Sequence, residues 1–365
     1  MKTILRTFVG CTAILFGTAC MGAVKYVPEN MKVELSLKVP GNNAVNYKLH
    51  PDKLENSYFD YEWRSDNKLP ITVFHKVEER DSCMRLTVQL TAAQDVYFNY
   101  RQLLSTGYRH DNCQFYMPGF WYRRNLRSPK KAPSFHTSDS WLVREDRLSA
   151  PLTGIFSEKE KRFMTVNRLD DFSMDALATH KEGEIILSGK TSLGFTGFEN
   201  QQGIAMLSFG FPYREAPKSY IRKLTLAPEV EAFQLMKKGE SVLLTWEIME
   251  SGADDFSDFI QHTWEHCYDT YAPKPVENSY SIADMKQVLS CFFVNSLVDN
   301  QPLVYNSGIH LKVSDCERNG QAEVGFIGRV LLNAFNAWEY GWQSNREELK
   351  VNSTCLLYTS PSPRD

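Results

Sequence analysis

The chain has 365 residues, enough for one large or two medium domains, and its 42% hydrophobic content is ordinary for a globular protein. Its 41 Lys and Arg residues and 44 Asp and Glu residues give a formal net charge of −3, with no basic block. Because affinity for nucleic acid comes from clustered cations that face phosphates, this balance argues against a nucleic-acid partner.

The N-terminal residues, 1–23, have the pattern of an export signal. Lys2 and Arg6 precede an apolar stretch that ends near residue 19 and is too short to span a bilayer as a helix. Small residues before Cys20 predict that this cysteine is lipidated, although Gly17 stands where lipoprotein signals usually have leucine. Ordinary cleavage near residue 22 or 23 is the alternative. We therefore expect an exported protein of the periplasm or cell surface, with Cys20 as the candidate lipid anchor.

Residues 24–252 contain several segments in which apolar and polar side chains alternate with period two. Residues 33–39, 85–90 and 241–248 follow this pattern, which is typical of half-buried antiparallel strands. Gly, Pro, Asn and Asp turns separate further short runs at 162–168, 184–188 and 204–211. Many short strands without intervening helices predict an antiparallel β super-sandwich over 24–252.

Helical periodicity replaces this alternation at about residue 253. Apolar residues at three- and four-residue spacing predict an amphipathic connecting helix over 256–271, and a Pro-containing linker completes the segment 253–276. Ser281 and Asp284 have the spacing of a capping box, which predicts that a second helix begins there.

Two further helices are expected, one over 321–340 and the start of another over 345–351. The apolar stripes of these helices are too wide for two or three helices to bury alone, so we expect 277–354 to begin a larger α/α toroid. The last residues, 355–365, have neither a helical nor a strand period, and their prolines at 361 and 363 oppose a helix. They resemble read-through of a sequencing adapter, which implies a non-native tail on a fragment.

The cysteines outside the signal and the tail are odd in number and irregular in spacing. They are Cys83, Cys113, Cys267, Cys291 and Cys316. This arrangement predicts neither a disulfide framework nor a zinc motif, so we expect buried thiols, with one Cys83–Cys113 bridge as the alternative. His262 and His266 are four residues apart, but no third ligand lies near them in the sequence, so we expect no metal and no cofactor.

An aromatic and basic segment between residues 117 and 144 is the densest candidate for sugar binding. Aromatic faces stack on the C–H surfaces of sugars, while Arg and His bond to hydroxyl or acidic groups. The alternative is that the tryptophans belong to the sandwich core and the arginines protect strand edges. The predicted carbohydrate-binding residues, with one from a later loop, are Trp121, Tyr122, Arg123, Arg124, His136, Trp141, Arg144 and His310.

A compact acidic group in the loop before the third helix is the candidate for catalysis. Glycosidic hydrolysis requires two carboxyl groups, and Asp315, Glu317 and Glu323 form the one group placed for it. The alternative is that an acid in a first helical turn simply complements the helix dipole.

Residues 240–246 leading into 255–271, together with 319–326, carry a resemblance at the level of architecture. They resemble exported bacterial carbohydrate-active proteins in which an N-terminal β super-sandwich precedes an (α/α)6 toroid. That resemblance implies a polysaccharide or oligosaccharide partner, an anionic one among the options, and catalytic acids in the toroid. It favours a glycoside hydrolase over a polysaccharide lyase, with an inactive fragment here. The alternatives are a non-catalytic surface glycan-binding protein and a structural or assembly protein.

Overall fold

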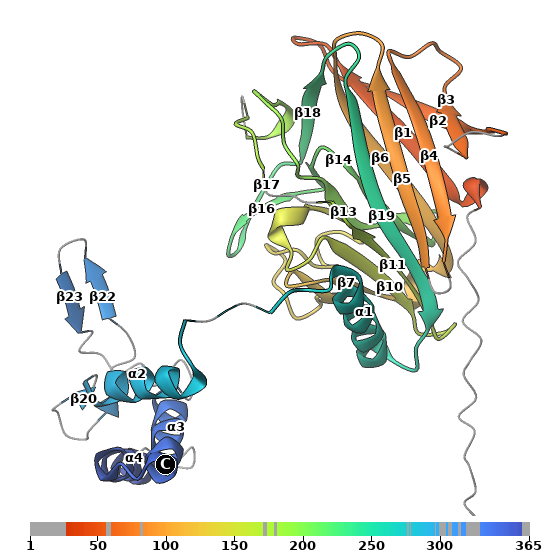
Figure 1. Cartoon of the computed structure of the whole chain (residues 1–365). Coiled ribbons are helices and arrows are strands. Elements are labelled where there is room, and N and C mark those ends of the chain that lie inside the picture. The colour runs from red at the N-terminus through yellow and green to blue at the C-terminus, as the bar shows by residue number, and fades with distance from the viewer. Residues whose placement is uncertain are drawn as a thin grey trace, which may run out of the picture. The chain divides into compact units, whose positions relative to one another are not determined.

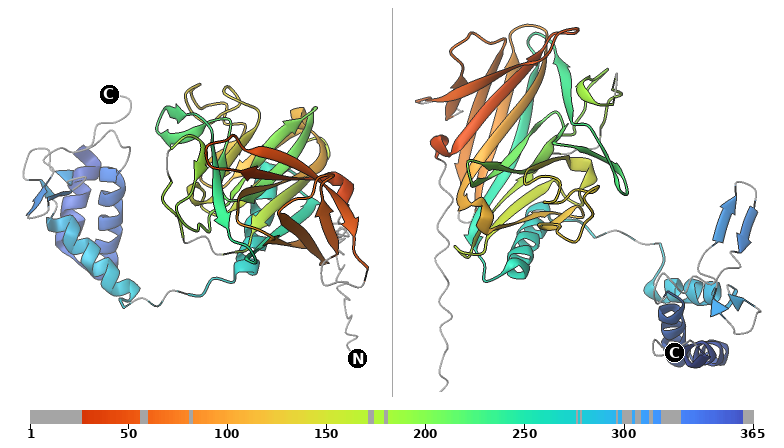
Figure 2. Two further views of the ribbon diagram at one scale, coloured as in Figure 1. Left: turned by 90° about the horizontal axis from the view of Figure 1, so that it is seen from above. Right: turned by 180° about the vertical axis from the view of Figure 1, so that it is seen from behind.

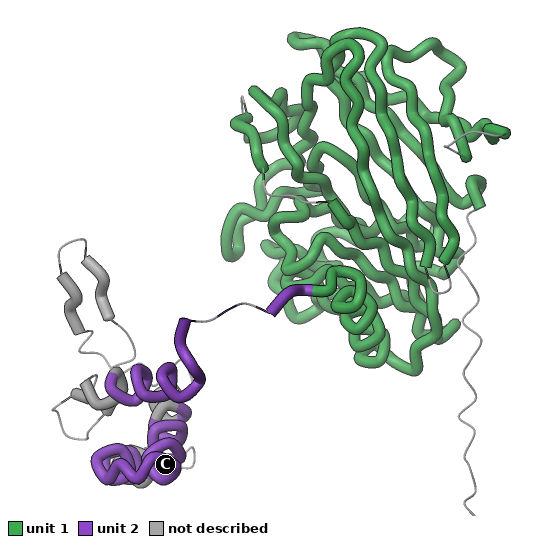
Figure 3. The backbone as a smooth tube through the Cα atoms, viewed as in Figure 1, with its two compact units in different colours: residues 1–272 green, residues 273–365 purple. Residues whose placement is uncertain are grey.

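The computed structural model describes residues 27–55, 60–80, 83–170, 174–178, 181–275, 277, 279–295, 297–298, 304–305, 309–312, 315–318 and 329–359. The chain forms two compact units, Met1–Ala272 and Pro273–Asp365 (Figure 3). The first is β-rich and the second is mainly helical (Figure 1). Among the described residues, no helix is both long enough and apolar enough to cross a membrane.

The first unit is built from two antiparallel layers (Figures 1 and 2). One layer contains, in order, β2 (Val45–Lys53), β1 (Met31–Lys38), β6 (Val96–Arg109), β14 (Ile204–Phe211), β13 (Phe195–Gln201) and β9 (Trp141–Arg144). The other contains β3 (Tyr61–Arg64), β4 (Ile71–Glu79), β5 (Cys83–Ala92), β19 (Ser241–Gly252), β11 (Arg162–Arg168), β10 (Leu152–Ser157), β7 (Cys113–Met117) and β8 (Trp121–Arg123). Strand β2 joins the layers because it pairs with both β1 and β3.

Shorter elements complete this unit. β18 (Val230–Met236) pairs with β6, with β15 (Arg214–Glu215) and, in parallel, with β12 (Gly183–Ile186). β16 (Ser219–Arg222) and β17 (Thr225–Ala227) form a hairpin. The 3-10 turns are η1 (Pro28–Asn30), η2 (His110–Asn112) and η3 (Glu145–Arg147).

The core lies between the two layers, and it confirms the strands that alternation predicts. The alternating segments 33–39, 85–90 and 241–248 correspond to β1, β5 and β19, and the further runs 162–168 and 204–211 coincide with β11 and β14. Side chains from the two layers meet directly: the ring centroids of Phe209 and Trp246 are 5.2 Å apart, and His75 Nε2 lies 2.7 Å from Tyr100 Oη. Burial lowers the pKa of His75 to about 3, so this imidazole is neutral inside the sandwich.

Helix α1 (Phe256–Tyr271) confirms the predicted connecting helix. Asp255 caps it by accepting hydrogen bonds from the amides of Ser257 and Asp258 at 2.7 and 3.0 Å. On its inner face Phe259 packs against Phe156 of β10 and Phe163 of β11, with ring centroids 6.0 and 4.9 Å apart. The helix is therefore part of the hydrophobic structure of the β-rich unit.

The thiols of the first unit that the structure describes are free. Cys83, Cys113 and Cys267 are buried and unbridged, as the irregular spacing predicts, so the alternative of a Cys83–Cys113 disulfide is wrong. Burial raises the pKa of Cys83 to about 11 and that of Cys113 to about 12, which makes both thiols poor nucleophiles at neutral pH.

The second unit contains helices α2 (Ile282–Asn295), α3 (Arg329–Ser344) and α4 (Glu347–Thr359) and the short strands β20 (Leu297–Val298), β21 (Val304–Tyr305), β22 (Ile309–Lys312) and β23 (Asp315–Arg318). The capping box is confirmed, because Ser281 Oγ accepts from the Asp284 amide at 3.1 Å and Asp284 accepts from the Ser281 amide at 2.9 Å. Apolar side chains on α2 and α3 remain exposed, including Ile282, Val288, Leu332 and Trp342.

Three sequence predictions for this unit need correction. Residues 309–312 and 315–318, which are expected in a loop before the third helix, pair as strands β22 and β23, and α3 ends at Ser344, beyond the predicted end at 340. Helix α4 continues to Thr359, so the expectation of irregular structure from residue 355 is wrong for its first five residues. The reason is local: Pro361 disfavours helical geometry in the residue before it, so its effect begins only at Ser360.

Gly197 in β13 provides a test of the pairing between β13 and β9. A Cβ atom there would lie 2.0 Å from the Trp141 carbonyl oxygen and 2.9 Å from Leu142 Cα, so the strands would have to separate. We expect Gly197→Ala to lower the free energy of unfolding by about 1–3 kcal/mol, measured by urea denaturation. Gly252→Ala is the matched control, since its nearest atom is 3.7 Å away. Equal effects of the two substitutions would contradict this account.

Candidate functional site

Two of the predicted sugar-binding residues belong to the core. Trp121 and Trp141 are 0% and 1% exposed, their ring centroids are 5.9 Å apart, and both indole nitrogens donate to backbone carbonyls. A buried indole has no face to offer a sugar. The prediction that these tryptophans stack on a glycan is therefore wrong, and the core alternative holds, because β8 and β9 direct them between the layers.

Other members of the predicted cluster bind the protein's own backbone. Arg124 donates to the carbonyl oxygens of Cys113 and His110 at 3.2 and 3.4 Å, and His136 Nε2 lies 2.9 Å from the Leu126 carbonyl oxygen. Tyr122 is half exposed and the guanidinium of Arg123 lies 5.1 Å from the Phe256 ring. The structure thus disperses this cluster instead of gathering it into one site.

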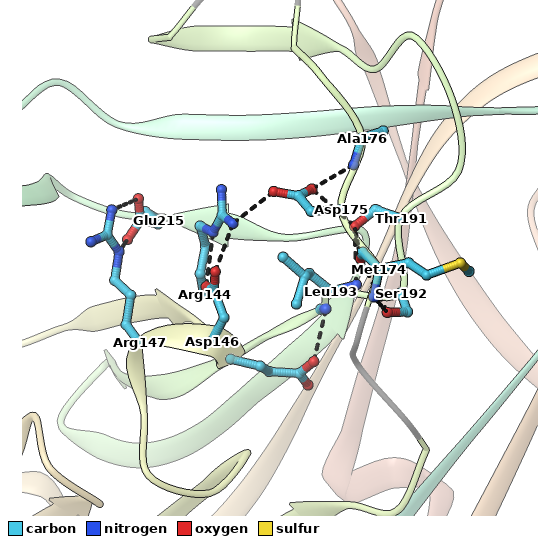
Figure 4. Close-up of polar contacts among 12 residues, drawn as sticks. Arg144, Asp146, Arg147, Met174, Asp175, Ala176, Thr191, Ser192, Leu193 and Glu215 are labelled. Carbon is cyan, nitrogen blue, oxygen red and sulfur yellow. Dashed lines mark hydrogen bonds and ion pairs between the residues drawn. The ribbon is translucent and has the colours of Figure 1, made fainter. Parts of the chain in front are cut away.

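Arg144, one of the predicted residues, lines a cavity. The cavity has a volume of about 580 Å³ and is open to solvent. Figure 4 shows its arginines with their acidic partners. Its lining residues come from three separate parts of the chain and are Gly119, Phe120, Arg144, Asp146, Arg147 and Tyr220.

Turn η3 places the charged residues of the cavity. Within it Glu145 is fully buried, and its Oε2 accepts from Arg168 Nη1 at 2.7 Å and from the Gly194 amide at 2.8 Å. Burial raises the pKa of Glu145, and Arg168 and the Gly194 amide oppose that rise. Because Glu145 is held from inside, its neighbours Asp146 and Arg147 project to the surface.

The two arginines are held by carboxylates. Arg144 donates to both oxygens of Asp146, at 3.0 and 2.8 Å, and to Asp175 at 3.0 Å, while Arg147 donates to the buried Glu215 at 3.1 Å (Figure 4). Burial alone lowers the pKa of Arg144, but the hydrogen bonds and charges of Asp146 and Asp175 outweigh burial and raise it. The carboxylates hold both guanidinium groups in place, so little rotamer freedom is left to lose on binding.

Aromatic side chains supply the apolar part of the cavity. The rings of Phe120 and Tyr220 meet edge to face with centroids 6.0 Å apart. Gly119 turns the chain toward Phe120 with φ of +79°, and a Cβ there would lie 2.6 Å from Ser149 Oγ. Both the left-handed backbone and the lack of space favour glycine at this point.

The arrangement suits a small polyhydroxylated ligand. Guanidinium donors, the Asp146 acceptor and two aromatic rings provide the mixed polar and apolar contacts that sugar rings use. The two cations of the site are Arg144 and Arg147, and their carboxylate partners are Asp146, Asp175 and Glu215. Because the carboxylates outnumber the cations, the local charge favours a neutral ligand over an anionic one. Sequence reasoning missed Asp146, Arg147 and Tyr220; the charged run after the strand at 141–144 was a usable signal, whereas nothing in the sequence links Tyr220 to it.

The candidate catalytic residues belong to the second unit. Asp315 and Glu317 are in β23, and His310 in β22 is the register partner of Glu317. Glu323 lies outside the described residues, as does Cys20. Their predicted roles stay predictions.

Three metal-binding residue types meet beneath α1. His262 pairs with Asp258 of its own helix at 3.5 Å, but His266 Nε2 lies 2.7 Å from Glu247 Oε1 on β19. A donor atom of Cys83 lies within 4.8 Å of those of Glu247 and His266. Cys83 and Glu247 are distant from His266 in sequence, so the spacing of His262 and His266 could not reveal this group.

Comparison with known proteins gives no family. No protein-family model matches, and no curated protein matches. Similar solved structures include a polysaccharide lyase at a TM-score of 0.29 and 14% identity, covering 64% of this chain and 27% of the lyase. A Synechocystis protein matches at a TM-score of 0.31 and 7% identity, and the match covers 59% of this chain and 73% of that protein. An α-galactosidase of Geobacillus stearothermophilus matches at a TM-score of 0.26 and 10% identity, and the match covers 60% of this chain and 30% of the galactosidase. The chain thus spans about a quarter of the lyase. TM-scores this low assign no activity.

Proposed function

We propose that the β-rich unit binds a saccharide in the cavity beside η3, as part of an exported carbohydrate-active protein. The observation that supports this is the cavity itself, in which Arg144, Arg147 and Asp146 stand beside the Phe120 and Tyr220 rings. The arginine donors are preorganised by their acidic partners, so ligand hydroxyls would meet groups that are already oriented. Export rests on the signal-like pattern of residues 1–23, with Cys20 as the proposed lipid anchor.

A glycan array screened with the full chain tests this proposal, followed by calorimetry with the best oligosaccharide. We expect Arg147→Ala and Tyr220→Ala each to weaken binding by about tenfold or more, because a hydrogen bond to a charged group contributes about 1.5–3 kcal/mol and ring stacking contributes further. Arg109→Ala is the control for charge, since Arg109 is exposed and pairs only loosely with Asp111 at 3.6 Å.

The salt dependence of binding identifies the ligand class. A neutral saccharide is expected to bind with nearly the same affinity at low and high NaCl, whereas a uronate or sulfated ligand would lose affinity as salt screens its charge. Absence of any array hit, or equal weakening by Arg109→Ala and Arg147→Ala, would refute saccharide binding at this cavity.

We further propose that the second unit begins an α/α toroid of a carbohydrate-active enzyme. A glycoside hydrolase is the preferred class, and a polysaccharide lyase is the second choice. The exposed apolar side chains of α2 and α3 support this, because such surfaces normally pack against further structure. Asp315, Glu317 and Glu323 are the proposed catalytic acids. A surface protein that binds glycans without cleaving them is the alternative, and release of reducing ends or unsaturated products by the full chain would contradict it.

A further inference from the structure

A buried junction between α1 and the sheet contains an unused set of metal-binding side chains. Cys83 begins β5, and its register partner on β19 is Met249; Glu247 lies two residues from Met249, so it shares a face of the sheet with Cys83. That face is covered by α1, which contributes His266. One sulfur, one carboxylate oxygen and one imidazole nitrogen lie within 4.8 Å of one another.

The surroundings fix these donors. Cys83 and Glu247 are each 4% exposed, and the His266 side chain is 21% exposed. Glu247 Oε1 lies 2.7 Å from His266 Nε2 and accepts from Thr270 Oγ1 at 3.0 Å, while Oε2 accepts from Arg85 at 3.3 Å. These contacts orient the carboxylate toward the helix before any ion is present.

We propose that Cys83, Glu247 and His266 bind a zinc-class divalent cation that ties α1 to the sandwich. Thiolate, imidazole and carboxylate are the ligands that zinc takes in proteins, whereas calcium and magnesium prefer oxygen alone. Three protein ligands leave a fourth tetrahedral position for water. The three donors come from β5, β19 and α1. The bound cation would therefore link α1 to the two strands on which it packs.

Binding has a definite proton and charge balance. The Cys83 thiol releases its proton to solvent and binds as thiolate, and His266 binds through Nε2 as the neutral imidazole with its proton on Nδ1. The hydrogen bond between His266 and Glu247 is replaced by two bonds to the metal. Thiolate and carboxylate together neutralise the dication, so Arg85 faces a centre without net charge.

Cobalt(II) titration of the full, chelator-treated chain tests the site, because tetrahedral thiolate–cobalt centres have a sulfur-to-metal charge-transfer absorption. We expect one equivalent to bind with this absorption, zinc to displace it, and zinc to raise the melting temperature. Cys83→Ser should abolish the absorption, and His266→Gln should weaken binding by at least about tenfold. Circular dichroism establishes that each variant is folded.

Matched controls lie on the same helix. Cys267→Ser removes a second buried thiol and His262→Gln a histidine one turn away, and neither should change cobalt binding. If Cys83→Ser does not fold, Glu247→Gln, which keeps the shape of the side chain, must lower the affinity instead. No charge-transfer absorption in the wild-type chain, or absorption that persists in folded Cys83→Ser, would show that these residues form only a hydrogen-bonded anchor for α1.

Discussion

Replacing Arg168 with methionine is expected to lower the free energy of unfolding by about 3–5 kcal/mol at pH 8, because it leaves a buried carboxylate without its counter-charge. Arg168 and Glu145 are 3% and 0% exposed, and their side chains are 2.7 Å apart. Arg168 also donates to Asp170 at 3.1 Å. Since Glu145 anchors η3, the loss should also disorder the cavity residues beside it.

The cost of Arg168→Met should depend on pH in a definite direction. Burial already raises the pKa of Glu145, and removal of Arg168 takes away its main opposition, so the folded variant favours the protonated acid. The free energy of unfolding of the variant is therefore closest to that of wild type near pH 4.3, about the pKa of a glutamate in the unfolded chain. The difference grows as the pH rises above that value. Urea denaturation between pH 5 and 8 measures this difference.

Arg109→Met is the matched control for Arg168→Met, since Arg109 makes an exposed pair with Asp111. We expect it to change the free energy of unfolding by less than about 0.5 kcal/mol at every pH. If Arg168→Met lowered the free energy of unfolding equally at every pH, or if both variants lowered it equally, the burial of the Arg168–Glu145 pair would not explain the loss.

The sandwich and α1 could be predicted from sequence because both depend on local periodicity. Val33 and Leu35 share a buried face of β1, and Phe256, Phe259 and Cys267 share the buried face of α1. These patterns are properties of consecutive residues and survive without knowledge of the fold. The end of α4 is not predicted, because residues 355–359 show no helical period and the prolines after them oppose a helix.

The cavity could be predicted only in part, since its residues come together through long-range pairing. Arg144 was identified by type, but its place beside Tyr220 depends on the position of the β16–β17 hairpin, which no local signal gives. The same limit applies to Cys83 and His266, because strands β6 to β19 lie between them in sequence. Residue type predicts Trp121, Tyr122 and Trp141 as ligand contacts, whereas strand geometry sends alternate side chains inward and buries the two tryptophans.

Trp121→Ala is expected to lower the free energy of unfolding by about 3–5 kcal/mol, because it removes a fully buried indole and leaves a cavity. The ring packs against Phe198 and Phe135, with centroids 5.1 and 6.0 Å away, and its Nε1 donates to the Arg123 carbonyl oxygen at 2.9 Å. Truncation therefore removes packing and leaves that carbonyl without its donor. Thermal and urea denaturation both measure the loss.

The adjacent Tyr122 provides the matched comparison, because it is 51% exposed and belongs to the same short strand. Tyr122→Ala should change stability by less than about 1 kcal/mol. If saccharide binds at the η3 cavity, folded Trp121→Ala protein should retain affinity for it once the unfolded fraction is subtracted, while Tyr220→Ala should not. Full stability together with lost binding in Trp121→Ala would instead require the indole to be accessible to ligand, against its position between the two layers.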